Sequence, residues 1–331
     1  TLGGRGGFTH PAIVAAAVRP PGHGPIAGAG HRLRTPIAGA QCHSAPESQD
    51  GPMDTSPWIR DFATLGLNDV AQVGGKTASI GEMSSQLHDA RVRVPEGFAL
   101  TAAAYRHALD RAGAWPALHA ALDGLNRQDV GAIATAAARA RALVEGLPMP
   151  PEIESALRTT WREWCGRCHG DLRVAVRSSA TAEDLPGASF AGQHDTLLDV
   201  GDEEALLAAI RHCQASLFTD RAVAYRIDHG FDHFQVALSV AVMRMVDASS
   251  AASGVIFTLD TESGHPGVIL VTGTWGLGDA LVQGLADPDE FLVHKAGLRA
   301  GHRCVLSRQR GRKQQRLVGA ARPRSPVWPA G

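Results

Sequence analysis

The stretch from Val174 to Val200, VAVRSSATAEDLPGASFAGQHDTLLDV, most constrains the fold of this chain. It begins with a valine-rich run typical of a strand, and a second strand is predicted to begin near Gln193. The first strand delivers Arg177 into a loop with several hydroxyl side chains, and two glycines, Gly187 and Gly192, follow. A fixed guanidinium, hydroxyls and a flexible loop favour a polyphosphate cradle, with an ordinary polar hairpin as the alternative.

A second glycine-bearing stretch, VGGKTASIGEM, begins at Val73. Its two adjacent glycines allow the backbone to approach a ligand closely. A helix is predicted from Lys76 to Ala90, and exposed N–H groups at a helix start favour an anion. The stretch is not a Walker A motif, because Val70 stands where that motif requires a glycine. The alternative is a glycine turn with a solvated lysine.

The remaining pattern predicts an α+β fold, with helices first and a mixed half after them. Residues 92–101 are predicted to be extended, three alanine-rich helices are expected between Thr101 and Leu147, and another helix starts at Pro151. Asp202 is expected to cap a further helix. Further strands are predicted within residues 235–246, 252–260, 267–273 and 289–295.

Charge is distributed unevenly along the 331 residues. All 33 acidic residues lie between Glu47 and Glu290, whereas four Lys and Arg residues precede Glu47 and ten follow Glu290. Residues 1–52, rich in Gly, Ala and Pro, are predicted to be a disordered extension that is not native to the fold. The basic tail, residues 296–331, raises the alternative of a nucleic-acid-binding protein. No apolar run is long enough for a membrane span, and five scattered cysteines favour the cytoplasm.

Cys165, Cys168 and His169 spell the C-x-x-C-H pattern of haem attachment. A thioredoxin site needs a strand before the pair and a helix after it, and here the predicted order is reversed. A glycine at 166 is expected to break the helix, so we interpret the pair as an incidental helix-to-strand connection. Cys213 lies on an apolar helix face and is predicted to be a core residue, whereas His233 is predicted to be an ordinary surface or loop residue.

Five motifs, in this order, resemble one family: VGGKTASIGEM, VPEGFALT, VRSSATAEDLPGASFAGQHDTLL, GVIFTLDTESG and GLGDALVQGLADPDEFLVHK. They are similar to the N-terminal nucleotide-binding part of the phosphoenolpyruvate synthase (pyruvate, water dikinase) family. The resemblance runs from about Trp58 to about Val318. It implies an ATP-grasp domain of two α+β subdomains within residues 53–295, between disordered N-terminal and C-terminal extensions. The C-terminal extension, residues 296–331, is weakly similar to the family at first and then irregular.

In that family, ATP passes its β-phosphoryl group to a histidine on a swivelling domain, and a TIM barrel then uses it to phosphorylate pyruvate. By resemblance, Lys76 and Arg177 contact the phosphates of ATP and are the candidate catalytic residues. The candidate ATP-binding residues are Lys76, Arg177, Ser178, Ser179, Thr181, Gly192 and Thr196. Placed positive charge is what phosphoryl transfer needs most.

Two departures from the family qualify this reading. Met243 stands where the family often has glutamine near the adenine. No carboxylate follows Glu290, so the ligands of Mg²⁺, the metal expected with ATP, are expected beyond the end of this chain, and pyruvate would be reached only through domains absent here. We therefore expect the chain to be inactive alone. A rifampicin phosphotransferase-like ATP-binding fragment is the alternative within the same superfamily.

Overall fold

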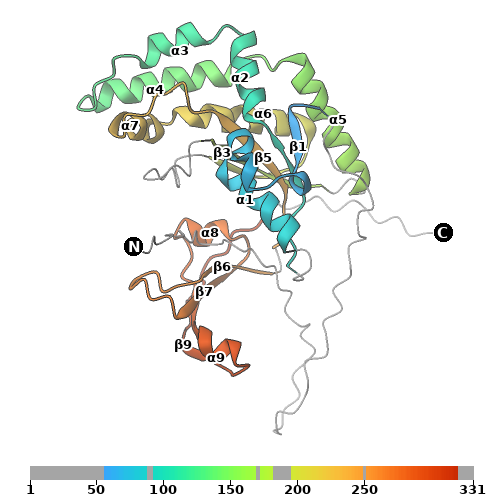
Figure 1. Ribbon diagram of the computed structural model, residues 1–331, viewed down its shortest axis with the longest axis vertical. Helices are drawn as coiled ribbons and strands as arrows, with labels where there is room; N and C mark the ends of the chain where they lie inside the picture. The colour runs from blue at the N-terminus through green and yellow to red at the C-terminus, as the bar shows by residue number, and fades with distance from the viewer. Residues whose placement is uncertain (1–55, 88–91, 169–171, 182–194, 249–250, 320–331) are drawn as a thin grey trace, which may run out of the picture. The chain divides into compact units, whose positions relative to one another are not determined.

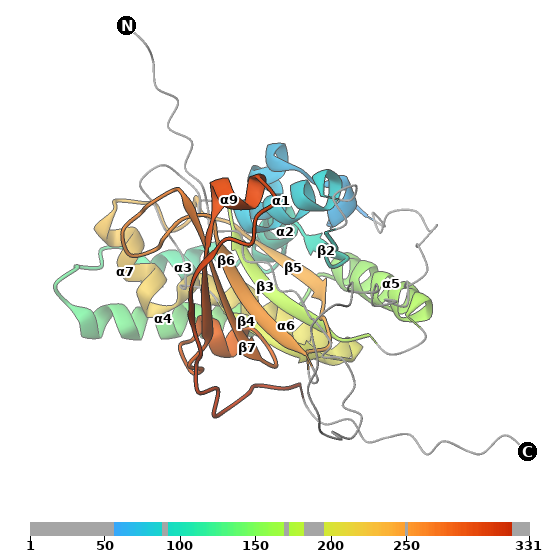
Figure 2. The same cartoon turned by 90° about the horizontal axis from the view of Figure 1, so that it is seen from below.

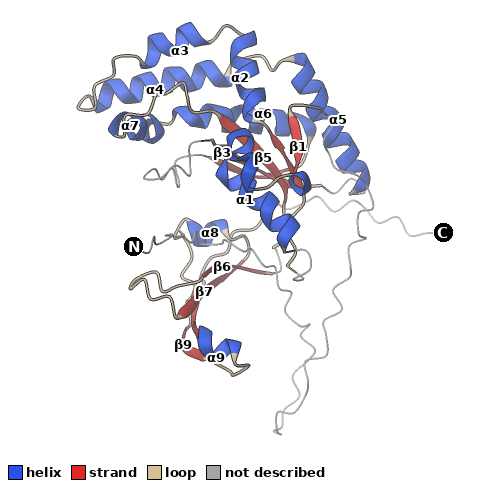
Figure 3. Cartoon of the chain, in the orientation of Figure 1, coloured by secondary structure: helices blue, strands red, loops and turns tan. Residues whose placement is uncertain are grey.

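A computed structural model describes residues 56–87, 92–168, 172–181, 195–248 and 251–319. The described chain divides into two compact units, one that ends at Met245 and one that begins at Val246. We call them the N-terminal unit and the C-terminal unit and describe each by itself. Each unit contains both helices and antiparallel strands (Figure 3), so the prediction of an α+β fold is confirmed.

A five-stranded antiparallel sheet lies at the centre of the N-terminal unit, with the strand order β1-β2-β5-β3-β4. Interior strands β5 and β3 are valine- and alanine-rich because side chains on both of their faces leave water. The strands are β1 (Ile59–Asp61), β2 (Gly97–Leu100), β3 (Val174–Ala180), β4 (Thr196–Val200) and β5 (Leu238–Arg244).

Helices make up most of the rest of this unit. Three of them fill the alanine-rich segment where three were predicted, and Asp202 caps α6 by accepting a hydrogen bond from the Ala205 N–H at 2.8 Å. The α-helices are α1 (Val70–Gln86), α2 (Ala102–Arg111), α3 (Trp115–Leu122), α4 (Val130–Glu145), α5 (Pro151–Arg167), α6 (Glu203–Ala215) and α7 (Asp220–Asp228). Short 3₁₀ helices are η1 (Phe62–Thr64), η2 (Leu67–Asp69) and η3 (Ser216–Phe218).

The larger core of the unit lies on one face of this sheet. Val176 and Val242 point to that face and pack into a cluster that also contains residues of α2, α4, α5 and α6. Trp164 of α5 is fully buried there and meets the Phe98 ring edge-on, with 5.9 Å between ring centroids. This core is the main source of apolar burial in the unit.

The opposite face of the sheet carries α1. Ala99 of β2 and Ala241 of β5 form a smaller core with Val73 and Ala78 of α1. Figure 2 shows β3 and β5 between α1 and α6, and Figure 1 shows α1 crossing the same two strands. Alanine at these sheet positions allows the helix to approach the strands closely, so α1 is held against β3.

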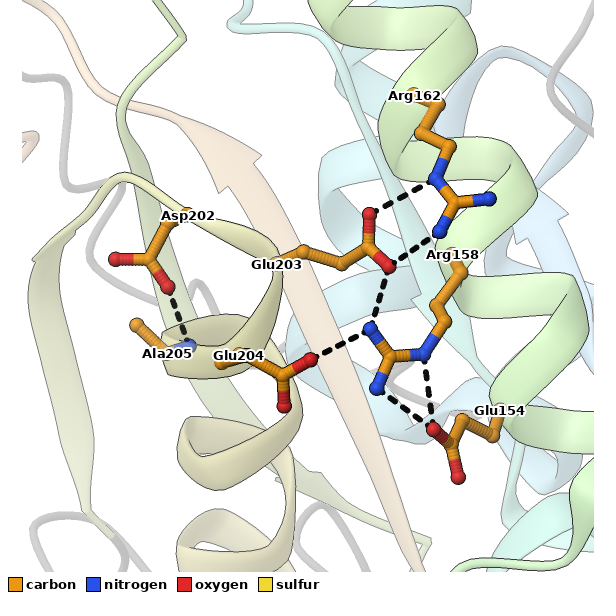
Figure 4. Close-up of polar contacts among 7 residues, drawn as sticks. All are labelled: Glu154, Arg158, Arg162, Asp202, Glu203, Glu204 and Ala205. Atoms are coloured by element: carbon orange, nitrogen blue, oxygen red, sulfur yellow. Dashed lines mark hydrogen bonds and ion pairs between the residues drawn. The ribbon is translucent and has the colours of Figure 1, made fainter.

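A network of charged side chains joins α5 to the first turn of α6 (Figure 4). Arg158 donates hydrogen bonds to Glu204 at 2.7 Å, to Glu203 at 2.5 Å and to Glu154 at 2.7 Å. Arg162 adds two hydrogen bonds to the Glu203 carboxylate. These bonds raise the pKa of Arg158, and hydrogen bonds from Arg158 and then Arg162 lower the pKa of Glu203. The network therefore links two helices that pack on the larger core.

Arg226 of α7 is fully buried, and it changes the interpretation of His233. Its Nε donates to His233 Nδ1 at 2.9 Å and its Nη1 donates to the Leu217 carbonyl at 2.8 Å. The guanidinium also lies 5.6 Å from the centre of the Phe218 ring. Burial, and then the charge of Arg226, lowers the pKa of His233 to about 4. His233 lies in a turn, as the prediction of a surface or loop residue requires. It is not an ordinary loop residue, because its ring accepts a hydrogen bond from a buried arginine.

The cysteine pair lies at the C-terminal end of α5. The helix continues through Gly166 to Arg167, so the glycine expected to break it does not. Cys165 and Cys168 are half-buried, and burial raises the pKa of both thiols, which disfavours the reactive thiolate. His169 lies outside the described residues. Cys213 is fully buried and burial raises its pKa to about 12, so its prediction as a core residue is confirmed.

The C-terminal unit is built on a four-stranded antiparallel sheet in the order β6-β7-β8-β9. Its strands are β6 (Ala252–Phe257), β7 (Val268–Trp275), β8 (Asp289–His294) and β9 (Val305–Gln309), with helices α8 (Asp279–Val282) and α9 (Lys295–Arg299). The first three strands match the prediction. β9 lies in the basic stretch after Lys295, where no strand was predicted, and it pairs with β8. A hollow of about 600 Å³, floored by Ile256, Val271 and Val293, lies on one face of this sheet.

Across all the residues described, no helix has the length and apolar character needed to cross a membrane.

Candidate functional site

The glycine-bearing stretch of α1 is where this helix is interrupted. α1 begins at Val70, before the predicted start at Lys76, but Gly74 within it has φ 73° and ψ 163°. That backbone conformation is open to glycine and strained for other residues. Lys76 and Thr77 therefore lie in the first turn of the helical segment that follows the break. This confirms, with a different helix boundary, that Lys76 lies near a helix start.

Arg177 and Thr196 are neighbours on adjacent strands. They form a register pair between β3 and β4, and Ala241 of β5 pairs with Arg177 on its other side. Paired residues of an antiparallel sheet point to the same face, with Cβ atoms about 4.5–5.5 Å apart. Ala241 belongs to the small core that α1 covers. Both candidate residues are thus on the α1 face of the sheet.

Ser179 joins the two glycine-bearing stretches. It lies two residues beyond Arg177 on the same face, and its Oγ accepts a hydrogen bond from the Thr77 N–H at 3.3 Å. A Cβ atom added at Gly74 would lie 2.3 Å from Ser179 Oγ and 2.6 Å from its carbonyl oxygen. The two segments, 102 residues apart between Thr77 and Ser179, are therefore in direct contact, and glycine at 74 is what permits it.

The candidate hydroxyls of Ser178 and Thr181 make hydrogen bonds within the protein. Ser178 Oγ donates to the Asp195 carbonyl at 3.2 Å, which ties β3 to the start of β4. Thr181 Oγ1 bonds with the Ala237 carbonyl and N–H, both at 3.2 Å. Gly192 falls outside the described residues. A direct contact between these hydroxyls, or Gly192, and a ligand stays a prediction.

The candidate residues differ in exposure. Lys76 and Thr196 are exposed, and Arg177 is half-buried between its strand neighbours. Met243 is half-buried on the same face of β5, where it pairs with Ala175 and packs against the smaller core. Exposed or half-exposed cationic groups over one sheet face are suited to an anionic ligand, because hydrogen bonds from a cation to an anion are charge-assisted.

Metal ligation receives little support from the described part of the chain. No group of three or more His, Cys, Asp or Glu side chains gathers there in a way that could hold a metal ion. The expectation that the ligands of Mg²⁺ lie elsewhere stays a prediction.

The comparison with known families bears directly on this geometry. A family model described as the pyruvate phosphate dikinase AMP/ATP-binding domain matches residues 70–325, which is well over half of the chain. The match includes both the Gly74 turn and β3. The chain belongs to this family. The matched range also includes most of the basic stretch after Lys295, in which β9 lies.

Curated relatives of this family member are phosphoenolpyruvate synthases. The protein of Pseudomonas aeruginosa is 48% identical over 79% of this chain and 33% of its own length. That of Escherichia coli is 46% identical over 80% of this chain and 34% of its own length. The probable enzyme of Methanocaldococcus jannaschii is 40% identical over 74% of this chain and 20% of its own length. The chain thus spans about a third, or less, of the length of these relatives.

Sequence reasoning did not identify the part played by Thr77. Its side chain was not among the candidates, and it is the backbone N–H that meets β3. The only local signal is position: the residue follows two glycines and Lys76, so it lies in the first turn after a helix break, where N–H groups lack helical acceptors.

Proposed function

We propose that the chain binds ATP where the turn at Gly74 meets the end of β3, with Lys76 and Arg177 contacting the phosphates. Thr196 lies beside Arg177 and would line the same site, and Gly192 would approach it from the loop after β3. The two units would correspond to the two subdomains of an ATP-grasp fold. In the complete protein, this ATP would supply the phosphoryl group for phosphoenolpyruvate synthesis from pyruvate and water.

The observation that carries this proposal is the contact of Gly74 and Thr77 with Ser179. It brings the turn that bears Lys76 against the strand that bears Arg177, on one face of one sheet. Membership of an AMP/ATP-binding family supports the ligand class. The names of the relatives support the reaction.

The chemistry of the candidate residues is suited to this role. Phosphoryl transfer depends on positioning and on charge stabilisation more than on covalent help from the protein. Arg177 offers a planar fork of donors, and Lys76 offers a compact charge beside helical N–H groups. Mg²⁺ would arrive with ATP and neutralise part of the phosphate charge. The hydroxyls of Ser178 and Thr181 would fix the point at which the loop leaves β3.

Isothermal titration calorimetry with MgATP tests the proposal on the wild-type chain, Lys76→Ala and Arg177→Ala. Each variant removes a charge-assisted contact, so we expect the binding free energy to weaken by about 1–3 kcal/mol in each. Arg162→Ala is the matched control, since it removes a cation from α5 that is engaged with Glu203. It should bind MgATP as the wild type does.

Two results would contradict the assignment. One is that the Lys76 and Arg177 variants bind MgATP as tightly as the Arg162 variant. The other is that the wild-type chain does not bind MgATP.

A further inference from the structure

We propose that Ser179 is a positioning residue, which holds the turn bearing Lys76 in place relative to Arg177 instead of contacting ATP itself. The inference rests on the proposed function, because it concerns the same nucleotide site. Ser179 is 0% exposed, as is Thr77, so the hydrogen bond between them is shielded from water. A buried N–H that loses its acceptor is not rescued by solvent.

The role of this bond follows from the break in α1. The N–H groups that follow a helix break have no acceptor in the preceding turn, and a side-chain oxygen usually caps one of them. Here the capping oxygen comes from β3, because Ser179 Oγ accepts from the Thr77 N–H. The cap therefore also attaches the helical segment to the sheet.

Gly74 makes the attachment close as well as hydrogen-bonded. The space that a side chain at Gly74 would need is filled by Ser179 Oγ, at 2.3 Å, and by the Ser179 backbone carbonyl. Ser179 thus contacts Gly74, which precedes Lys76 in the sequence, and Thr77, which follows it. A change at Ser179 would displace Lys76 while leaving its charge intact.

The strand end of the attachment is equally well defined. Ser179 and Arg177 are two residues apart on β3, so their side chains point to the same face. The Ser239 hydroxyl of β5 donates to the Leu100 carbonyl of β2 at 2.8 Å and so joins β5 to β2, whereas Ser179 pairs with Ser239 through the backbone ladder between β3 and β5. β3 is therefore fixed at this point by its neighbours, and Lys76 is placed relative to a fixed Arg177.

A double-mutant cycle distinguishes positioning from direct contact. MgATP affinity is measured by calorimetry for the wild-type chain, Ser179→Ala, Lys76→Ala and the double variant. We expect Ser179→Ala to weaken MgATP binding about 5- to 30-fold, and the double variant to bind within about twofold of Lys76→Ala alone. Additive losses would indicate that Ser179 contacts the nucleotide independently and would overturn the inference.

Ser239→Ala is the matched control, because it also removes a fully buried serine hydroxyl from the same face of the sheet. It should lower the urea midpoint of unfolding, as Ser179→Ala does, while MgATP affinity stays within about twofold of the wild type. If Ser179→Ala behaved in the same way, with normal affinity, the residue would be merely structural and the inference would fail.

A measurement on the wild-type chain keeps the inference testable if Ser179→Ala does not fold. The Thr77 amide should exchange its hydrogen as slowly as amides of the core strands, with or without MgATP, because it is buried and bonded. Exchange at the rate of exposed loops would overturn the inference. Normal MgATP binding by Lys76→Ala would overturn the assignment of Lys76 and this inference together, whereas normal binding by Ser179→Ala alone would overturn only the inference.

Discussion

Replacement of His233 by asparagine should remove a specific part of the acid sensitivity of this protein. His233 is half-buried, and its Nδ1 accepts a hydrogen bond from the buried Arg226. Burial and the arginine charge lower the pKa of His233 from 6.5 to about 4 in the folded chain. Asp232 and Asp123 oppose this shift but do not cancel it. The asparagine side chain would offer an oxygen near the position of Nδ1 and would not titrate.

The sign of the effect follows from the two pKa values. Because the folded pKa is the lower one, the unfolded chain takes up the proton first as the pH falls below 6.5. The stabilising contribution of neutral His233 is therefore complete above that pH and is lost progressively down to about pH 4. Linkage gives a loss of about 2 kcal/mol at about pH 5, which solvent around a half-buried ring reduces to about 1–2 kcal/mol.

Urea unfolding of the wild-type chain and His233→Asn, at about pH 7.5 and about pH 5, measures the contribution of His233 to the pH dependence of stability. Carboxylates also titrate in this range, but they affect both proteins alike. Their contribution therefore cancels when the unfolding free energies of the two proteins are compared at each pH. We expect the wild type to lose about 1–2 kcal/mol more than the variant between these two pH values. Equal losses in the two proteins would contradict the lowered pKa of His233, since they would show that His233 titrates alike in the folded and unfolded chains.

Three further predictions follow from the contacts described. Gly74→Ala should destabilise the fold by more than about 2 kcal/mol, because Gly74 has a positive φ and an added Cβ would clash with Ser179. Gly113→Ala should cost only about 1 kcal/mol, because Gly113 has φ 58° but open space around it. Equal urea-unfolding free energies for the two variants would contradict the close approach of Gly74 to Ser179. Arg158→Met should lower the urea midpoint more than Arg162→Met does, because Arg158 binds three carboxylates, and the difference should shrink in high salt; a salt-independent difference would count against an ionic cause. Cys213, with its pKa raised to about 12, should resist alkylation in the folded chain and react fully on denaturation; mass spectrometry that finds rapid labelling of the native thiol would disprove its burial.

Local patterns predicted the helices and strands in which buried and exposed side chains follow a regular period. The valine-rich run before Arg177, the alanine-rich helices and the Asp202 cap each carry their own signal within about ten residues. β9 lacked such a signal because all five of its residues are exposed, so its sequence has no apolar alternation to read. Its place in the sheet comes from pairing with β8, which only the fold reveals.

The sequence supplied the residues of the candidate site, whose contact with ATP stays a prediction, but it did not show how the fold brings them together. The resemblance to a family selected Lys76 and Arg177, and the types of residue around them indicated a phosphate ligand. The contact between Gly74 and Ser179 could not be read from the sequence, since it joins segments about 100 residues apart through a glycine conformation that local patterns do not specify. The hydrogen bond of His233 was not foreseen for a similar reason, because it depends on how Arg226 packs.

The most direct test of the proposed ATP site is a crystal structure of this chain with a non-hydrolysable ATP analogue and Mg²⁺. We expect phosphate oxygens within about 3 Å of both Lys76 Nζ and the Arg177 guanidinium, with the Thr77–Ser179 hydrogen bond intact beside them. A nucleotide bound elsewhere, or one that touches neither of the two cations, would contradict the proposed site.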